Sequence, residues 1–279
     1  MGSCKVSALT LKGCLLEMKK SKGLLIDLDG TLYHGKHMIS GADTLIKTLK
    51  ELHIPYLFVT NNSSRTAEDV ADVLNSMGIL ASPQDVCTSS QAAAKYIACE
   101  SPGARVAVLG EKGLRHALSE AGLQEVQHSP QYVVQGIDRT FTYHSLTTAI
   151  GWINEGAQFI LTNPDLLLPS DDGLIPGAGT IAAAIEAGSG VKPIVIGKPS
   201  SHLMTYAMDI LGMEPSDVIV IGDNMRTDIA AGEAAGCETV LVLTGITTSD
   251  NLQQHIESTG VKPDVICKDL HELLKVLTS

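Results

Sequence analysis

Short apolar runs alternate with amphipathic segments along most of the chain. GLLIDLD (23–29) and PYLFVT (55–60) are typical of buried strands, whereas GADTLIKTLKEL (41–52) repeats its apolar residues at helical spacing. The same two patterns predict helices at 66–78, 145–156, 180–188, 202–212, 229–236 and 269–277, and strands at 106–110, 132–137, 158–162, 193–197, 217–223, 238–243 and 264–267. Strands that alternate with helices form parallel sheets covered on both faces. The pattern therefore predicts an α/β fold built on a doubly wound, Rossmann-like parallel sheet.

Four of the predicted strands end abruptly in polar residues. These ends read LLIDLDGT, LFVTNNSS, IVIGKPS and IVIGDNMRTD. Open parallel sheets bind their ligands beyond the carboxyl ends of the strands. If the four strands share one sheet, seven polar side chains converge at one edge: Asp27, Asp29, Thr60, Asn61, Lys198, Asp223 and Asp228.

The four strands fall into two groups that are far apart along the chain. The segment between them contains enough predicted strands and helices for a domain of its own. We therefore expect a catalytic core made of residues 21–81 and 190–279, interrupted by an inserted α/β cap domain of residues 82–189. Residues 1–20 are predicted to be a leader outside these domains. Residues 1–17 are expected to be a poorly ordered extension, or to be absent if translation begins at Met18.

Composition excludes several classes of function. Hydrophobic residues make up 44% and charged residues 18%, as in ordinary folded proteins. The net charge of −11 gives no electrostatic support for binding nucleic acid or an anionic membrane, and no apolar run has the ~18 residues of a membrane helix. The six cysteines form no C-x-x-C pair, which favours reduced thiols in the cytoplasm over disulfides or a zinc site. An anionic substrate would need local positive groups or a metal ion.

Several acids in the predicted cluster suit a magnesium ion. Asp27 and Asp29 are two residues apart at a strand end, so their side chains share a face. Asp223 would bring a third carboxylate from another strand. Close carboxylates repel one another unless a cation compensates, and a set of oxygen ligands suits Mg²⁺.

The polar strand ends also fit phosphoryl transfer. A carboxylate can attack phosphorus to form an aspartyl-phosphate, and a neighbouring carboxyl can serve as general acid and then general base. The charge that develops on the transferred oxygens needs donors already in place. Thr60, Asn61 and Lys198 are the candidate donors.

Four motifs in this order resemble those of the haloacid dehalogenase superfamily of aspartate-nucleophile phosphatases. They are DLDGT (27–31), TNN (60–62), GKP (197–199) and GDNMRTD (222–228). TNNSS soon after the first motif, followed by a large insertion before GKP, resembles the branch that contains the N-acetylglucosamine-operon phosphatase and the p-nitrophenyl phosphatases.

The resemblance implies a role for each matching residue. Asp27 would be the nucleophile and Asp29 the general acid and base. The resemblance further implies phosphate contacts from Thr60, Asn61, Asn62 and Lys198, a Mg²⁺ site of Asp27, Asp223 and the Asp29 carbonyl, and support behind that site from Asn224 and Asp228.

Some of these residues also have simpler interpretations. A calcium loop starting at Asp27 fails because Leu32 and Met38 occupy its glycine and glutamate positions. His34 and His37 are expected to be loop residues or contacts at substrate entry rather than metal ligands. The turn-rich stretch 162–179 has two equally open interpretations. It is a functional loop, or Asn163 and Asp165 in it are ordinary turn formers.

We therefore expect a Mg²⁺-dependent phosphatase acting on small phosphate monoesters, with a cap that closes over the site and selects the substrate. Sugar phosphates, nucleotides and similar metabolites all remain open as substrates. A phosphotransferase or phosphomutase that uses the same intermediate is the alternative, followed by a non-catalytic binding protein on the same scaffold. A homodimer through an exposed face of the cap is compatible with the sequence.

Overall fold

The computed structural model describes residues 22–170 and 173–278, so the predicted leader and Met18 lie outside the described residues. The chain divides into two compact units. The first comprises the described residues of Met1–Phe58, Leu74–Leu80 and Met208–Ser279, and the second comprises those of Val59–Val73 and Ala81–Ala207. This division groups 59–73 and 190–207 with the inserted segment, whereas the sequence placed them with the core. The domain boundaries at 81/82 and 189/190 stay a prediction.

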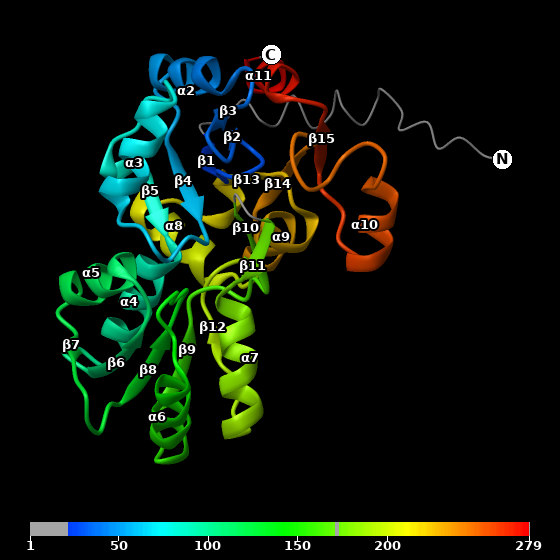
Figure 1. Ribbon diagram of the computed structural model, residues 1–279. Helices are drawn as coiled ribbons and strands as arrows, with labels where there is room; N and C mark the ends of the chain where they lie inside the picture. Colours follow the sequence, from blue (N-terminus) through cyan, green and yellow to red (C-terminus); the bar gives the residue numbers. More distant parts are fainter. Residues whose placement is uncertain (1–21, 171–172, 279) are drawn as a thin grey trace. The chain divides into compact units, whose positions relative to one another are not determined.

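A parallel sheet forms the centre of the first unit, with the strand order β15-β14-β13-β1-β4 (Figure 1). Its strands are β1 (Gly23–Ile26), β4 (Tyr56–Thr60, of which Tyr56–Phe58 belong to this unit), β13 (Val218–Gly222), β14 (Glu238–Val242) and β15 (Val265–Cys267). Leu25 of β1 pairs with Val220 on one side and with Leu57 on the other. All residues of β1 and β13 are buried, because helices cover both faces of the sheet.

The order of the strands creates a switch point at the middle of the sheet. From β1 the chain moves outward to β4 on one side, and it later returns to β13 on the other side and moves outward through β14 and β15. Ligands of doubly wound sheets bind beyond the carboxyl ends of the strands at such a point. Asp27 follows β1 and Asp223 follows β13, so both lie at the switch point.

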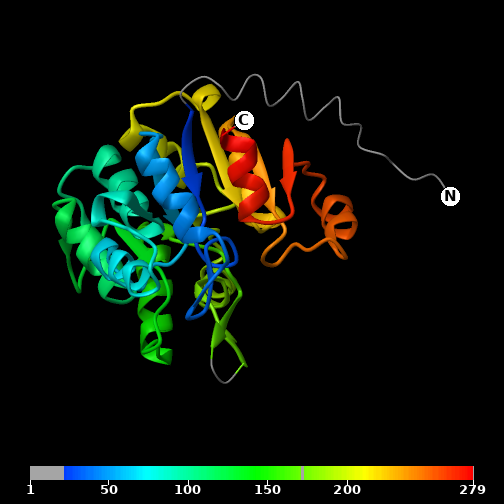
Figure 2. The same ribbon diagram turned by 90° about the horizontal axis from the view of Figure 1, so that it is seen from above.

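Helices pack on both faces of this sheet. Helices α2 (Ala42–Glu51) and α11 (Leu270–Thr278) lie side by side on one face, and α9 (Ala230–Ala235) lies on the other (Figures 1 and 2). The remaining elements of this unit are the hairpin of β2 (Tyr33–His34) and β3 (His37–Met38), a short π-helical turn (Met225–Ile229) and α10 (Leu252–Thr259). Helices α3 (Ala67–Ser76) and α8 (His202–Leu211) each contain residues of both units.

The second unit has its own parallel sheet, with the strand order β12-β9-β8-β6-β7. Its strands are β6 (Arg105–Leu109), β7 (Gln124–Glu125), β8 (Tyr132–Gln135), β9 (Gln158–Leu161) and β12 (Ile194–Val195). The remaining elements of this unit are β5 (Val86–Thr88), α4 (Ser89–Glu100), α5 (Lys112–Glu120), α6 (Tyr143–Asn154), α7 (Ala178–Ser189) and the hairpin of β10 (Leu167–Ser170) and β11 (Gly173–Pro176). Side chains from one face of the sheet, such as Val133 and Phe159, form an apolar core with Ile153 of α6 and Ile185 of α7.

The predicted α/β class is confirmed, but some elements were not predicted. Helices α4, α5 and α10 were not predicted from the alternating pattern, and 162–179 was expected to be irregular. Helix α4 is rich in alanine, so its apolar face is weak, yet the Thr88 hydroxyl and Gln91 form a capping box at its start. Among the described residues, none of the helices is both long enough and apolar enough to cross a membrane.

Candidate active site

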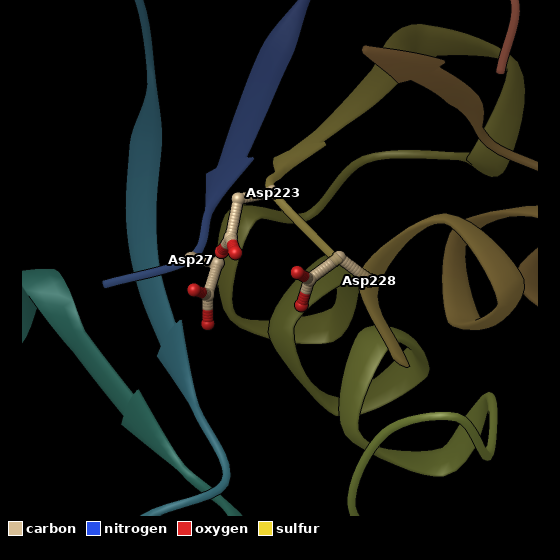
Figure 3. A group of neighbouring side chains, drawn as sticks. All are labelled: Asp27, Asp223 and Asp228. Atoms are coloured by element: carbon tan, nitrogen blue, oxygen red, sulfur yellow. The ribbon is translucent and has the colours of Figure 1, made fainter. Parts of the chain in front are cut away.

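Asp27 and Asp223 come together because β1 and β13 are neighbours that end side by side. The Asp27 N–H donates to the Ile221 carbonyl at 2.8 Å, which continues the pairing one residue beyond β1. Figure 3 shows Asp27 and Asp223 leaving these two strands, with Asp228 facing them from the turn before α9. Strand ends predicted from the sequence therefore bring these three side chains to one place.

The three carboxylates form a compact group. Asp27, Asp223 and Asp228 each offer a carboxylate oxygen, and these oxygens lie within 4.8 Å of one another. Asp223 and Asp228 are each 1% exposed, and Asp27 is half-buried. Three carboxylates this close and this buried repel one another strongly unless a cation lies between them. The oxygen-only donor set fits a hard divalent ion, so the predicted metal site passes this chemical test.

Asp223 is oriented by donors from two loops. The Thr31 hydroxyl donates to its Oδ1 at 3.2 Å, and the Ile246 N–H donates to its Oδ2 at 2.6 Å. These contacts hold the carboxylate plane in one orientation. Neither residue was predicted as part of the site. For Ile246 the sequence does contain a signal, because LVLTGITT is a fifth strand end that changes abruptly from apolar to polar residues.

Asp228 is also held by the backbone of its own turn. The Asn224 N–H donates to Asp228 Oδ2 at 3.1 Å, and the Asn224 side chain accepts from the Arg226 N–H at 2.9 Å. The predicted support role of Asn224 therefore has a physical basis as a cap of this turn. Asp228 was predicted to lie behind the metal ligands, whereas the structure places its carboxylate within the three-acid group.

Asp29 differs from the other acids in its exposure. It is exposed and lies in a bridge with Tyr33, immediately before Gly30, whose φ of 91° turns the chain. An exposed carboxyl at the turn after β1 is accessible to a substrate oxygen and to solvent protons. Its side chain is not one of the three carboxylates of the compact group.

The loop after β4, in the second unit, carries the TNN motif. Thr60 is 8% exposed, and its hydroxyl oxygen accepts from the Asn62 N–H at 3.1 Å. The oxygen of the Asn62 side chain accepts from the N–H groups of Ser64 at 2.9 Å and Arg65 at 3.2 Å, which closes a tight turn. The Thr60 hydroxyl uses its oxygen as an acceptor in this turn, so its proton can be donated elsewhere.

Lys198 is buried next to the same loop. Only 3% of Lys198 is exposed, and its Nζ donates to the Val59 carbonyl at 3.2 Å. The Asn61 side chain bonds the Lys198 backbone twice: its Oδ1 accepts from the Lys198 N–H at 2.8 Å and its Nδ2 donates to the Lys198 carbonyl at 3.0 Å. Burial raises the pKa of the nearby Cys87 thiol, and the positive charge of Lys198 opposes this shift.

The predicted site residues thus form two groups within the described residues. The first unit assembles Asp27, Asp223 and Asp228, and the second assembles Asn61 and Lys198 beside Thr60 and Asn62. The Nε2 of His34 lies 2.6 Å from the Thr244 carbonyl oxygen. Because a carbonyl can only accept, the His34 Nε2–H donates this hydrogen bond. The catalytic roles themselves stay predictions.

Comparisons with known proteins agree with the motifs. A family model described as haloacid dehalogenase-like hydrolase matches residues 24–124, and a related model of hydrolases of the same superfamily matches residues 195–273. The chain is 45% identical over 240 residues to a 5'-nucleotidase, YutF, from Bacillus subtilis, covering 86% of this chain and 94% of that protein. It is 44% identical over 261 residues to an acid sugar phosphatase from Staphylococcus saprophyticus, covering 93% and 99%.

Solved structures show the same relationship. The p-nitrophenyl phosphatase from Archaeoglobus fulgidus matches with a TM-score of 0.87 and 40% identity, covering 92% of this chain and 99% of that one. Sequence identity of this extent over nearly the whole length places the motifs and the fold in one family. The chain therefore belongs to the haloacid dehalogenase-like hydrolases, in the branch that contains the p-nitrophenyl phosphatases.

Proposed function

We propose that this phosphoric monoester hydrolase is a Mg²⁺-dependent phosphatase that forms an aspartyl-phosphate on Asp27. The observation that carries the proposal is the three-carboxylate group at the switch point of the sheet, where Asp27 is the half-buried member and therefore the one with access to a substrate. A bound divalent ion would be held by Asp27, Asp223 and the Asp29 carbonyl, with the Asp228 carboxylate close beside them. When bound, it would neutralise the repulsion between a carboxylate nucleophile and an anionic phosphate.

The proposed reaction has two steps. One Asp27 oxygen bonds to phosphorus while the bond from phosphorus to the leaving oxygen breaks, and Asp29 gives its proton to that oxygen. Asp29, now a carboxylate, then takes a proton from water, whose oxygen bonds to phosphorus and releases inorganic phosphate and Asp27. The Thr60 hydroxyl and the Lys198 ammonium are proposed to donate to the phosphoryl oxygens, where charge develops in the transition state.

The proposed substrate class is small phosphorylated metabolites. The relatives are named for a nucleotide, for sugar phosphates and for an artificial aryl phosphate, which supports a phosphate monoester with a variable leaving group. The residues proposed to bind the phosphoryl group and the ion lie at the strand ends, whereas the leaving group would be selected elsewhere. A cytoplasmic location remains the prediction drawn from the scattered cysteines.

The proposal is tested with Asp27→Asn, which keeps the size of the side chain but removes the nucleophilic carboxylate. We expect no detectable release of inorganic phosphate from a panel of sugar phosphates and nucleotides supplied with Mg²⁺. Asp209→Asn, which changes an exposed aspartate of α8, is the matched control and should keep the full rate. Chelation with EDTA should stop the wild-type enzyme, and Mg²⁺ should restore it.

A trapped intermediate gives a second readout. Acid quench during turnover, followed by peptide mass spectrometry, should place the phosphoryl group on Asp27. A phosphoryl group on another residue, or full activity of Asp27→Asn, contradicts the proposal. Substrate consumed without an equal amount of inorganic phosphate would instead indicate transfer to an acceptor other than water.

A further inference from the structure

The side chain of Asn61 has both of its donors engaged. An asparagine amide has one oxygen and two N–H groups. The Asn61 oxygen accepts from the Lys198 N–H, one N–H meets the Lys198 carbonyl, and Nδ2 also donates to Asp165 Oδ2 at 3.2 Å. The orientation of the amide is dictated by its partners, since a backbone N–H must face the oxygen and a carbonyl must face the nitrogen. The Asn61 side chain is therefore occupied in holding Lys198.

Asp165 accepts hydrogen bonds from two amides. Its Oδ2 is 3.2 Å from Asn61 Nδ2 and 2.7 Å from Asn163 Nδ2. Asn163 is 4% exposed, and its oxygen accepts from the Thr162 hydroxyl at 3.0 Å. A chain of hydrogen bonds thus runs from the end of β9 through Asp165 and Asn61 to the backbone of Lys198.

Close packing keeps this chain in place. A Cβ at Gly197 would lie 2.4 Å from the Thr162 carbonyl oxygen and 2.5 Å from Asn61 Oδ1, so only glycine fits directly before Lys198. The backbone of Asp165 is also held, because its carbonyl accepts from the Gly179 N–H at 2.9 Å in the first turn of α7. Because its own backbone is tied to a helix, Asp165 presents its carboxylate at a defined position.

We propose that Asp165 is a positioning residue for phosphoryl transfer, which orients the Asn61 amide and through it the backbone of Lys198. The inference rests on the proposed function, in which Lys198 binds the phosphoryl oxygens. Of the two interpretations of the 162–179 stretch, the proposal adopts a functional loop at Asp165.

The second N–H of Asn61 depends on Asp165 for its acceptor. Without the Asp165 oxygen this N–H loses its acceptor, and the amide can rotate away from the Lys198 backbone to bond water instead. Lys198 would then lose two hydrogen bonds that fix its main chain. A displacement of a catalytic group by ~1 Å can cost ~100-fold in rate.

The test compares Asp165→Ala, Asp165→Asn and Asp165→Glu in steady-state kinetics and in inhibition by inorganic phosphate. We expect Asp165→Ala to lower kcat/KM by ~10- to 100-fold. Asp165→Asn keeps an acceptor oxygen in the same place and should stay within ~3-fold of wild type. Asp165→Glu keeps the charge but moves the oxygen by one methylene, and it should lose more activity than Asp165→Asn.

The control is Asp138→Ala, which removes another aspartate from a sheet-end loop of the same unit. Asp138 bonds its own loop, accepting from the Thr140 N–H at 2.9 Å and from the Thr140 hydroxyl at 2.7 Å. We expect Asp138→Ala to keep the wild-type kcat/KM. Circular dichroism and thermal unfolding establish that each variant folds. If Asp165→Ala does not fold, the order of Asp165→Asn above Asp165→Glu carries the test.

A double-mutant cycle with Asn61→Ala separates positioning from a general structural role. If Asp165 acts through Asn61, the double variant should be no slower than the slower single variant, within ~2-fold. If the losses in kcat/KM of the two single variants multiply in the double variant, the inference is overturned. It is also overturned if Asp165→Ala keeps the wild-type kcat/KM, or if Asp165→Glu is more active than Asp165→Asn. Inactive Asp27→Asn together with unaffected Asp165→Ala would overturn only the positioning role, whereas active Asp27→Asn would overturn the proposed function.

Discussion

Replacing Gly245 with alanine should damage the three-carboxylate group by steric contact alone. A Cβ at this position would lie 2.1 Å from Asp223 Oδ2, 2.4 Å from its Cγ and 2.8 Å from its Cβ. Non-bonded heavy atoms pack at ~3.5 Å, so Asp223 or the loop must move by ~1 Å or more. The same loop supplies the Ile246 N–H that donates to Asp223, so either movement breaks the orientation of the carboxylate.

The expected magnitude follows from metal binding. Disturbing the groups that orient a metal ligand typically costs ~10- to 100-fold in affinity, or ~1.4 to 2.8 kcal/mol. With Mg²⁺ at 100 times the wild-type Kd, the ion stabilises the wild-type protein by ~2.7 kcal/mol, and a 100-fold weaker site would retain only ~0.4 kcal/mol. The variant should also lose ~1 to 3 kcal/mol in the absence of metal because of overpacking.

Isothermal titration with Mg²⁺ measures the Kd directly, and urea unfolding with and without Mg²⁺ measures the stabilisation. Gly151→Ala is the matched control, because its Cβ would meet nothing within 4 Å and the residue lies inside helix α6. This control should bind Mg²⁺ as the wild type does and gain ~0.5 to 1 kcal/mol of stability. An unchanged Kd in Gly245→Ala would refute the reasoning that Asp223 holds the ion in the described geometry.

Two further predictions concern titratable groups. Cys99 is exposed, whereas burial raises the pKa of Cys237 to about 11. Burial, together with the nearby Glu272 and Asp269, raises the pKa of Cys267 to about 12. Iodoacetamide at pH 8 should therefore label Cys99 first and the two buried thiols only after unfolding, which peptide mass spectrometry measures. The hydrogen bonds from Lys112 and from the Thr66 N–H lower the pKa of Asp69, so this carboxylate stabilises the fold above its ordinary pKa and the stabilisation is lost as the pH falls through the lowered value. Lys112→Met should therefore cost less than ~1 kcal/mol in urea unfolding at pH 7, because both side chains face solvent, and should cost nothing near pH 2; an equal cost at both pH values would contradict this assignment.

The sequence predicted the fold class and the three acids because both depend on local patterns. Apolar runs that end in polar residues mark buried parallel strands, and the carboxyl ends of parallel strands meet at one edge. Asp27, Asp223 and Asp228 were therefore predicted to meet at one edge of the sheet, although Asp228 was expected behind the metal ligands and Asp29 beside Asp27. Helix α10 was not, because it packs through partly buried residues such as Leu252 and Ile256 against the turn at Met225, and such a weak stripe leaves little periodic signal.

The residues that orient the acids and Lys198 could not be predicted from such local patterns. Thr31 and Ile246 act on Asp223 from positions 192 and 23 residues away in the chain. Asn61 and Asp165 are 104 residues apart, and nothing local distinguishes Asp165 from a turn former. Such contacts depend on how loops meet in three dimensions, which hydrophobic periodicity does not specify.

Glycine provides the part of this information that the sequence does contain. Each buried polar group of the two clusters needs backbone N–H groups close by, since an unpaired buried charge is costly. A Cβ would prevent that approach at Gly30, Gly197 and Gly245. At Gly30, for example, the Cβ would lie 2.5 Å from Asp223 Oδ2. Gly30 and Gly197 lie in the DG and GK pairs of two motifs, and Gly245 lies in the TG pair of the strand end LVLTGITT. A glycine that directly flanks a polar strand end therefore indicates more than a turn: it marks where a buried acid or amide is approached too closely for any side chain.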